Sequence, residues 1–426
     1  MIELKNCPIC SGEEWENMDH IRDQKYWYDK DMRLENEPVS FKICKRCGFV
    51  TYDYKSDEEL SEAYDSQRSI MQAGNIITCN RKNEYHEAFL GDVISASQKV
   101  LDVGCAQGSF LSLFPFSECY GTEWSEAFAA FAKNEYGVRV SKEINESRNY
   151  DLITYYHVLE HVQNPDKELE KIRPLLTDDG YLYISVPVFF DILDENSGSM
   201  CSDFESLFHL NHVNIFSKQS FYNLLNNAGF TIVKENETYY GHTVLCKKNQ
   251  GDNQPIILES WETRKEQLER YHHAIQMLNA KDIEGALQQE PLFPDAYMIK
   301  SVNTENMKNF DQGKEILEKG LKLMPDSSKI NFQYARLLFQ WDEQKPDNTF
   351  YSNNIRKAEE LFLKCLELKP GNEDCYYFLG LIAGKYKKDY KKAVNYLKES
   401  LRINPTKFVE TWNIISYLYK EMEQKS

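Results

Sequence analysis

Short apolar runs alternate with helix-like stretches between roughly residues 95 and 250, and this alternation restricts the fold more than any other feature of the chain. Four runs have the length and composition of buried strands: Lys99–Val103, Cys119–Glu123, Tyr150–Tyr156 and Gly180–Val186. Helix-like stretches such as Ser125–Tyr136 and Pro165–Leu176 lie between them. Apolar strands separated by helices predict a parallel sheet that is covered on both faces. We expect two further strands, at Phe230–Val233 and Thr243–Cys246, to close the sheet in antiparallel orientation.

The first of these strands leads into a turn that contains glycine. The residues after Lys99–Val103 are Gly104-Cys-Ala-Gln-Gly108, and we expect the turn to open a helix. Glycine is needed where the backbone bends sharply and a ligand comes close to it, and free N–H groups at a helix start bind the ligand's polar end. The second strand ends at Glu123, whose carboxylate can accept hydrogen bonds from the two hydroxyl groups of a ribose. The sequence therefore predicts a nucleoside-binding site at this edge of the sheet.

This pattern resembles the class I S-adenosylmethionine-dependent methyltransferases. Asp102, just before the turn, is typical of that family, and the turn lacks the Gly-x-Gly-x-x-Gly spacing of dinucleotide-binding proteins. The stretch Asp151–Val162 resembles the family's fourth strand and following loop, and Gly180–Pro187 resembles its fifth strand. A third glycine of the family is replaced here by Ala106. The resemblance covers about Asn83–Lys248 and implies an α/β fold with a Rossmann-like, seven-stranded methyltransferase sheet.

The resemblance also implies which residues would hold S-adenosylmethionine. They lie at the ends of the first, second and fourth strands: Asp102, Gly104, Gly108, Glu123, Trp124, Tyr155, Tyr156 and His157. Asp102 and the two glycines would lie beside the methionine part, and the two tyrosines and the histidine would face the sulfonium. Glu123 would hold the ribose hydroxyl groups, while Trp124 would either flank the adenine or be a core aromatic residue. The family's carboxylate that contacts adenine has only a weak candidate, Glu143.

Several histidines are candidates for a general base, which methyl transfer to a hydroxyl or an acidic C–H requires. They are His157, His161, His209, His212 and His242. We expect His212, His157 and His209 to be nearest the chemistry. His157 would point into the donor site, and His209 and His212 lie on the segment before a helix that covers the pocket in the family. The other two histidines have weaker claims, and His161 often only packs a helix in this family.

Two cysteine pairs near the start of the chain predict a metal site. Cys7-Pro-Ile-Cys10 and Cys44-Lys-Arg-Cys47 have the spacing of a four-thiolate zinc site, and we expect the zinc to be structural. The alternative is four reduced thiols without a metal. The 33 residues between the pairs are expected to hold a hairpin or a short helix, in the Trp15–Trp27 region. The other seven cysteines are scattered singly and are expected to be small buried apolar residues.

The segment after the second pair resembles a narrower group of enzymes. The stretch Cys44–Tyr64, CKRCGFVTYDYKSDEELSEAY, resembles the end of the zinc domain in methyltransferases of deoxysugar and surface-glycan pathways. The sugar C-methyltransferases of that group carry Tyr-His-Glu-His before the covering helix, where this chain has Phe208-His-Leu-Asn-His212. Because Asn211 replaces the glutamate, we expect an oxygen acceptor rather than a carbon acceptor.

The last part of the chain contains a repeat. Pro325, Pro370 and Pro405 each follow a helix-like run, with Gly313, Ala358 and Ala393 twelve positions earlier. The proline spacings are 35 and 45 residues, and a polar insertion around Asp342–Asn354 accounts for the longer one. A period near 34 with a terminal proline resembles the tetratricopeptide repeat, which implies a protein partner or self-association. The alternative is an unrelated helical bundle. A leading helix and a degenerate first repeat are expected at about residues 255–294.

Charge and hydropathy exclude some function classes. The net charge of −17 arises entirely from residues 1–253, and so acidic a half disfavours nucleic acid as a partner. No run of 18 apolar residues exists that could span a membrane, and the first residues show no secretory signal pattern, so we expect a cytoplasmic protein.

These observations predict three domains: a zinc-binding module and link at residues 1–65, the methyltransferase domain at 66–250, and helical repeats at 251–426. The predicted activity is S-adenosylmethionine-dependent methylation of an oxygen on a sugar, sugar-nucleotide or glycan acceptor. Two alternatives are a protein methyltransferase that recruits its substrate through the repeats and a non-catalytic scaffold that retains the fold.

Overall fold

The structure is a computed structural model. It describes residues 5–18, 27–28, 34–35, 41–52, 86–189, 212–238, 241–249, 257–258, 260–345, 350–368, 372–403 and 408–423. The chain divides into two compact units. The first comprises Met1–Phe190 and Ser199–Leu268, and the second comprises Asp191–Gly198 and Glu269–Ser426.

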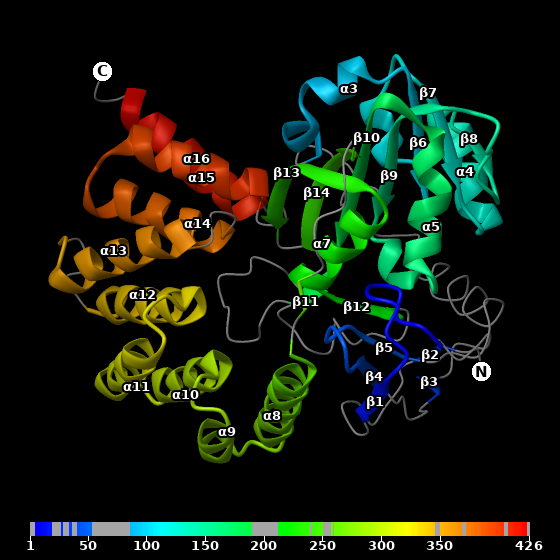
Figure 1. The fold of residues 1–426 in the computed structure, drawn as a ribbon. Helices are drawn as coiled ribbons and strands as arrows, with labels where there is room; N and C mark the ends of the chain where they lie inside the picture. The colour runs from blue at the N-terminus through cyan, green and yellow to red at the C-terminus, as the bar shows by residue number, and fades with distance from the viewer. Residues whose placement is uncertain are drawn as a thin grey trace. The chain divides into compact units, whose positions relative to one another are not determined.

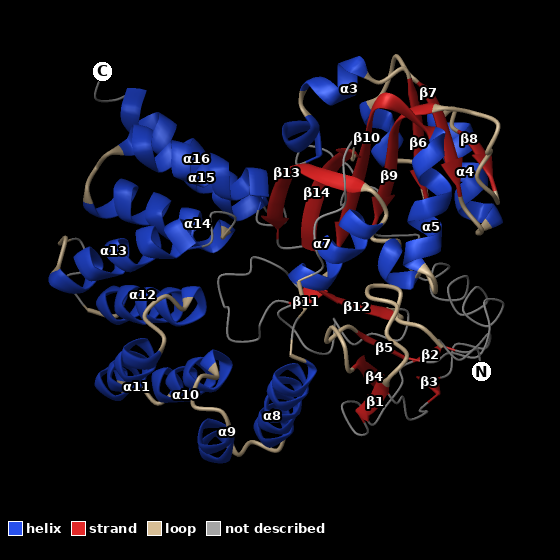
Figure 2. Ribbon diagram, in the orientation of Figure 1, coloured by secondary structure: helices blue, strands red, loops and turns tan. Residues whose placement is uncertain are grey.

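The centre of the first unit is a seven-stranded sheet with the strand order β13-β14-β10-β9-β6-β7-β8, drawn in red in Figure 2. Its strands are β6 (Lys99–Val103), β7 (Glu118–Thr122), β8 (Arg139–Ser141), β9 (Tyr150–Tyr156), β10 (Leu176–Val186), β13 (Phe230–Thr238) and β14 (Gly241–Lys248). Strands β6 to β10 run parallel to one another, whereas β14 is antiparallel to β10 and β13 is antiparallel to β14. This mixed, Rossmann-like sheet confirms the predicted fold class, including the antiparallel closing strands.

Helices cover both faces of this sheet, because its strands carry apolar side chains on alternate sides. On one face lie α3 (Asp92–Ala96), the 3₁₀ turn η1 (Phe110–Leu113) and α4 (Glu126–Tyr136), around a buried cluster that includes Phe110, Ala132 and Tyr183. On the other face lie α5 (Pro165–Ile172) and α7 (Lys218–Asn227), around a larger cluster. The side chain of Ser217 caps α7 in a reciprocal bond with Ser220, which fixes where this covering helix begins.

A second sheet joins the cysteine-rich N-terminal segment to the domain built on the seven-stranded sheet. Its order is β1-β4-β5-β12-β11. The strands are β1 (Trp15–Met18), β4 (Phe41–Cys44), β5 (Val50–Tyr52), β12 (Asn214–Ser217) and β11 (Val188–Phe189), and β12, β5, β4 and β1 lie side by side in Figure 1. Strand β5 pairs antiparallel with β12. Between the cysteine pairs, β2 (Trp27–Tyr28) pairs antiparallel with β3 (Leu34–Glu35), at the end of and beyond the Trp15–Trp27 region where a hairpin or a short helix was expected.

The elements described in the second unit are all helices. Its helices are α9 (Ile283–Gln289), α10 (Pro294–Asn306), α11 (Phe310–Leu323), α12 (Ser328–Glu343), α13 (Asn353–Leu368), α14 (Glu373–Leu381) with a π-helical turn η5 (Ile382–Tyr386), α15 (Tyr390–Ile403) and α16 (Phe408–Glu423). They follow α8 (Trp261–Asn279), the predicted leading helix. Helices α11, α13 and α15 each end two residues before Pro325, Pro370 and Pro405, as the repeat predicted. No helix among the described residues is both long enough and apolar enough to span a bilayer.

Small residues allow these helices to approach closely. A Cβ atom placed on Gly313 would lie 2.5 Å from Leu337 Cδ1, so α11 packs against α12 with no room for a methyl group. Ala358 and Ala393, the corresponding small residues of the next two runs, are fully buried. The sequence periodicity therefore reports real helix crossings.

Candidate active site

The turn after β6 is built so tightly that glycine is required at two positions. Gly104 and Gly108 have φ angles of +69° and +76°. A Cβ atom on Gly104 would lie 2.7 Å from Val158 Cγ2, and one on Gly108 would lie 2.8 Å from Ala132 Cβ. Ala106 also has a positive φ, of +46°, although it stands where the resembling family usually has a glycine. The turn is thus pressed between α4 and the loop that follows β9.

The helix expected after this turn is only the short 3₁₀ segment η1, so that prediction was wrong. Pro115 follows shortly after η1 and cannot donate a backbone hydrogen bond to continue it. The Ser112 hydroxyl donates to the Ser109 carbonyl at 2.7 Å, a local bond that competes with regular helix. The backbone N–H groups of the turn are held differently: that of Cys105 donates to Thr122 O at 2.9 Å.

Glu123 follows β7 and ties the ends of two neighbouring strands together. Its carboxylate accepts the N–H of Ala106 at 3.0 Å and the N–H of Ser125 at 2.8 Å. The side chain is buried, with 5% of the residue's surface exposed. Each carboxylate oxygen can accept more than one hydrogen bond.

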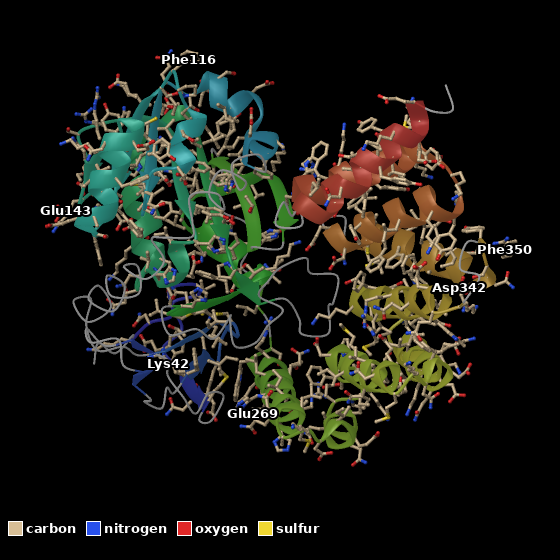
Figure 3. All side chains as sticks on the ribbon, turned by 180° about the vertical axis from the view of Figure 1, so that it is seen from behind. Lys42, Phe116, Glu143, Glu269, Asp342 and Phe350 are labelled. Atoms are coloured by element: carbon tan, nitrogen blue, oxygen red, sulfur yellow. The ribbon has the colours of Figure 1, made fainter. Side chains whose placement is uncertain are left out.

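Trp124 and Glu143 lie further out. Trp124 is 55% exposed, which excludes its interpretation as a core aromatic residue. Glu143, the weak candidate for an adenine contact, is also exposed and lies at the periphery of this domain in Figure 3. Trp124 is therefore an exposed aromatic side chain directly after the buried Glu123.

Asp102 provides a second buried carboxyl group beside the turn. It is 3% exposed, and the Thr154 hydroxyl donates to its Oδ1 at 2.6 Å. Burial raises the pKa of Asp102 to about 7, and the nearby charge of Glu123 adds to this rise, while the Thr154 bond opposes it. A positively charged group brought to this place would favour the ionised form.

The last residues of β9 point to opposite sides of the sheet. Tyr155 is fully buried, and its hydroxyl donates to Glu168 Oε1 of α5 at 2.7 Å. Tyr156 lies on the other side, with its ring centroid 4.6 Å from that of His86 and 4.7 Å from that of His157. Tyr155 is therefore a core residue, which leaves Tyr156 and His157 as donor-site candidates from this strand. Sequence reasoning missed His86, which carries no motif and is brought here only by the fold.

A histidine cluster lies just beyond the end of β9, on the 3₁₀ turn η2 (Leu159–His161) and before β12. The Nδ1 of His157 lies 3.2 Å from Glu160 Oε1, and the Nε2 of His161 lies 3.9 Å from the same oxygen. The ring centroids of His161 and His212 are 5.0 Å apart. The fold thus brings His157 and His212 to one place, with Glu160 between them. His209 lies outside the described residues.

Glu160 was not predicted as a site residue. It is fully buried, which raises its pKa, but the His157 hydrogen bond and the charges of the three histidines outweigh burial and hold the pKa below its ordinary value. Its position three residues after His157 and next to His161 was the available signal. The remaining candidate, His242, is fully buried, with its Nε2 3.0 Å from the Tyr222 hydroxyl and 3.3 Å from Glu235.

The four predicted cysteine ligands converge. The Sγ atoms of Cys7 and Cys47 are 3.6 Å apart, those of Cys10 and Cys44 are 3.5 Å apart, and all four lie within 4.8 Å of one another. Tetrahedral zinc with sulfur ligands at about 2.3 Å requires sulfur–sulfur distances of about 3.8 Å. Burial raises the pKa of the Cys7 thiol, a penalty that a bound cation would relieve. The donor set therefore fits a four-thiolate zinc site.

Comparisons with known proteins agree with this architecture. Residues 80–235 match a family model described as a methyltransferase domain, and residues 373–407 match a tetratricopeptide repeat model. A search of curated proteins found no match.

Similar solved structures include three methyltransferases. A mitomycin 7-O-methyltransferase is 16% identical over 45% of this chain and 58% of its own, with a TM-score of 0.35. The plantazolicin methyltransferase in complex with SAH is 16% identical over 45% and 90%, with a TM-score of 0.32. An S-adenosylmethionine-dependent methyltransferase from Clostridium acetobutylicum is 13% identical over 45% and 98%, with a TM-score of 0.33. The chain thus spans little more than half of the mitomycin enzyme. From the family-model matches and the strand order, the central part of the chain is a methyltransferase domain with a Rossmann-like sheet, and the C-terminal helical region contains a tetratricopeptide repeat.

Proposed function

We propose that this protein is an S-adenosylmethionine-dependent methyltransferase that acts on an oxygen of a sugar, sugar-nucleotide or glycan acceptor. The observation that carries the proposal is the pair of buried carboxyl groups, Asp102 and Glu123, at the ends of neighbouring parallel strands around a glycine turn. The matching methyltransferase domain model supports it. The sugar acceptor rests on the resemblance of the N-terminal cysteine segment to glycan-pathway methyltransferases.

The residues present fit this donor. At Gly104 and Gly108 a side chain would collide with neighbouring residues, so at these two positions the turn presents only its backbone. Glu123 would hold the ribose hydroxyl groups and Trp124 would cover the adenine, while Asp102, Tyr156 and His157 would lie nearer the sulfonium. When bound, S-adenosylmethionine supplies an electrophilic methyl group on a positively charged sulfur. Two buried acids suit that positive charge.

The protein's own contribution would be to align the acceptor, exclude water and take up a proton. His157 is oriented by Glu160: when its Nδ1 donates to the carboxylate, Nε2 carries the lone pair that can accept a proton. His212 lies in the same cluster and is the second candidate base, and His209 stays a prediction. An acceptor hydroxyl near these rings would pass its proton to one of them as its oxygen forms the new bond to carbon.

Donor binding can be tested by calorimetric titration of the full chain with S-adenosylmethionine. We expect the wild-type protein to bind and Glu123→Ala to bind about 10-fold to 100-fold more weakly, because a hydrogen bond to a charged group contributes about 1.5–3 kcal/mol. Glu126→Ala is the matched control, since Glu126 lies three residues away with its side chain 88% exposed. If well-folded wild-type protein takes up no donor, the protein is a scaffold that only retains the fold.

The acceptor can be tested with a labelled donor. The full chain would be incubated with sugar nucleotides and, separately, with a cell lysate. Label in the sugar fraction would support the proposal. Label confined to proteins that residues 255–426 also capture would support a protein acceptor, an alternative favoured by the tetratricopeptide repeat match.

We also propose that the four cysteines bind one structural zinc ion. Their sulfur distances and burial support this assignment. Because the four thiolates close the coordination sphere, the metal would contribute folding energy rather than chemistry.

A further inference from the structure

Three side chains beside the proposed donor site have the arrangement of a second metal site. Glu160 and His161 lie on η2, and His212 lies just before β12. One ligand atom of each can be chosen so that all three lie within 4.8 Å of one another. Glu160 is fully buried, and the His161 side chain is 21% exposed, so the group faces a partly open space.

We propose that Glu160, His161 and His212 bind a divalent transition-metal ion. Two imidazoles and one carboxylate form a ligand set that suits zinc, iron(II) or cobalt(II) and leaves coordination positions open for water or substrate. This set differs from the four-thiolate site, which is closed. The two sites therefore differ in expected affinity, spectrum and function.

Two buried oxygen atoms next to the cluster provide independent support. Within the described part of the chain, Glu160 Oε2 and Asn214 Oδ1 have no hydrogen-bond partner. A buried acceptor left without a partner costs about 1–3 kcal/mol, so the fold retains both against a penalty. A cation bound to the Glu160 carboxylate would compensate its unpartnered oxygen.

The neighbouring contacts hold these oxygens in position. The amide nitrogen of Asn214 donates to the carbonyl oxygens of Leu159 and Val162, at 3.1 and 2.5 Å, so its Oδ1 is the atom left over. The other carboxylate oxygen of Glu160 lies 3.2 Å from His157 Nδ1. His157 would thus act as the outer hydrogen-bond partner that orients a metal-binding carboxylate.

The cluster is adjacent to the glycine turn. Val158, two residues before Glu160, packs so close to Gly104 that a Cβ atom on this glycine would lie 2.7 Å from Val158 Cγ2. If the proposed methyltransferase function is correct, an acceptor hydroxyl bound to the metal would become more acidic. Its proton would pass to His157 as the oxygen lone pair forms the C–O bond and the C–S electron pair returns to sulfur. With a metal bound, His212 would be a ligand and not the base. This role rests on the proposed function, whereas metal binding itself does not.

Cobalt(II) titration of the zinc-loaded full chain tests the site. We expect one equivalent of cobalt(II) to bind with visible ligand-field bands and without the sulfur-to-metal charge-transfer band of a thiolate site. Glu160→Gln and His212→Ala should each weaken this binding at least tenfold. His273→Ala is the control, because His273 is an exposed histidine on α8.

The result is decisive in either direction. The proposal is overturned if the folded wild-type protein takes up no cobalt(II), or if it shows only the thiolate spectrum that replacement of zinc at the cysteines would give. The proposal is also overturned if both variants bind cobalt(II) as tightly as the wild-type protein does. If Glu160→Gln does not fold, His161→Asn and His212→Asn keep the test valid. Titration with S-adenosylmethionine is independent, so cobalt binding without donor binding would retain the metal site and reject the methyltransferase.

Discussion

Replacing Asp102 by asparagine should make the ligand-free protein more stable at pH 8. The pKa of Asp102 is raised from 3.8 to about 7, chiefly by burial. Because the folded protein holds this proton more tightly than the unfolded chain, the free energy of unfolding falls as the pH rises from about 4 to about 7. Above about pH 7, a pKa shift of this size lowers the free energy of unfolding by about 4 kcal/mol.

Asparagine removes the charge but introduces a different cost. The Thr154 hydroxyl can still donate to the side-chain oxygen of the asparagine, as it does to Asp102 Oδ1 at 2.6 Å. The new amide group is buried, and leaving it without an acceptor costs about 1–3 kcal/mol. The expected net gain at pH 8 for Asp102→Asn is therefore about 1–3 kcal/mol. Near pH 4 the gain should disappear and the variant should be the less stable of the two.

Urea unfolding at pH 4.5 to 8, monitored by hydrogen exchange of the β6 and β9 amides, would measure this difference within the sheet. Asp151→Asn is the matched control: Asp151 Oδ2 accepts the N–H groups of Gln98 and Lys99 at 3.0 and 2.9 Å, so its replacement should destabilise the protein. An Asp102→Asn variant that is less stable than the wild type at pH 8, or whose difference from it does not change with pH, would refute the reasoning.

Four further outcomes follow from the structure. Gly104→Ala should lower S-adenosylmethionine affinity at least tenfold by calorimetry, because the new methyl group meets Val158, whereas Gly137→Ala, with a similar φ of +68° and nothing within 4 Å, should leave it unchanged. Cys44→Ser should lower the zinc content by about one equivalent in metal analysis; an unaltered content contradicts the thiolate site. Gly313→Ala should destabilise the helical unit by about 1–3 kcal/mol in thermal unfolding, since overpacking has this cost. Unchanged stability would show that the Leu337 side chain can move aside without cost. Affinity for S-adenosylmethionine should rise between pH 6 and pH 8, because Asp102 loses its proton in this range. An affinity that does not change with pH would show that Asp102 does not contribute to donor binding.

The sheet and the repeats were predictable because their signals are local. Apolar strands and the helices between them follow from residue periodicity, and the glycine turn marks the end of β6. The ends of α11, α13 and α15 follow from the prolines, which cannot continue a helix. The same local logic placed the two cysteine pairs at one site.

What the sequence did not reveal depends on contacts between distant segments. Alternation along β9 sends Tyr155 toward α5 and Tyr156 toward His86, and strand register decides which is which. Glu160 and His161 are joined by His212 only because the segment before β12 lies beside them, which the local sequence does not show. The short η1 reflects Pro115 and the competition of the Ser112 hydroxyl with the backbone, which helix propensity alone describes poorly.

The pairing of β5 with β12 makes the cysteine segment inseparable from the methyltransferase domain. The Thr51 hydroxyl donates to the carbonyl oxygen of Val213, the residue directly after His212, at 2.7 Å. Removing the segment would leave β12 as an unpaired edge, and such edges recruit strands from other chains and promote aggregation. A chain without this segment would therefore be less soluble and would also lose the contacts that position His212. Any engineered version of this protein has to keep the cysteine segment together with the proposed methyl-transfer site.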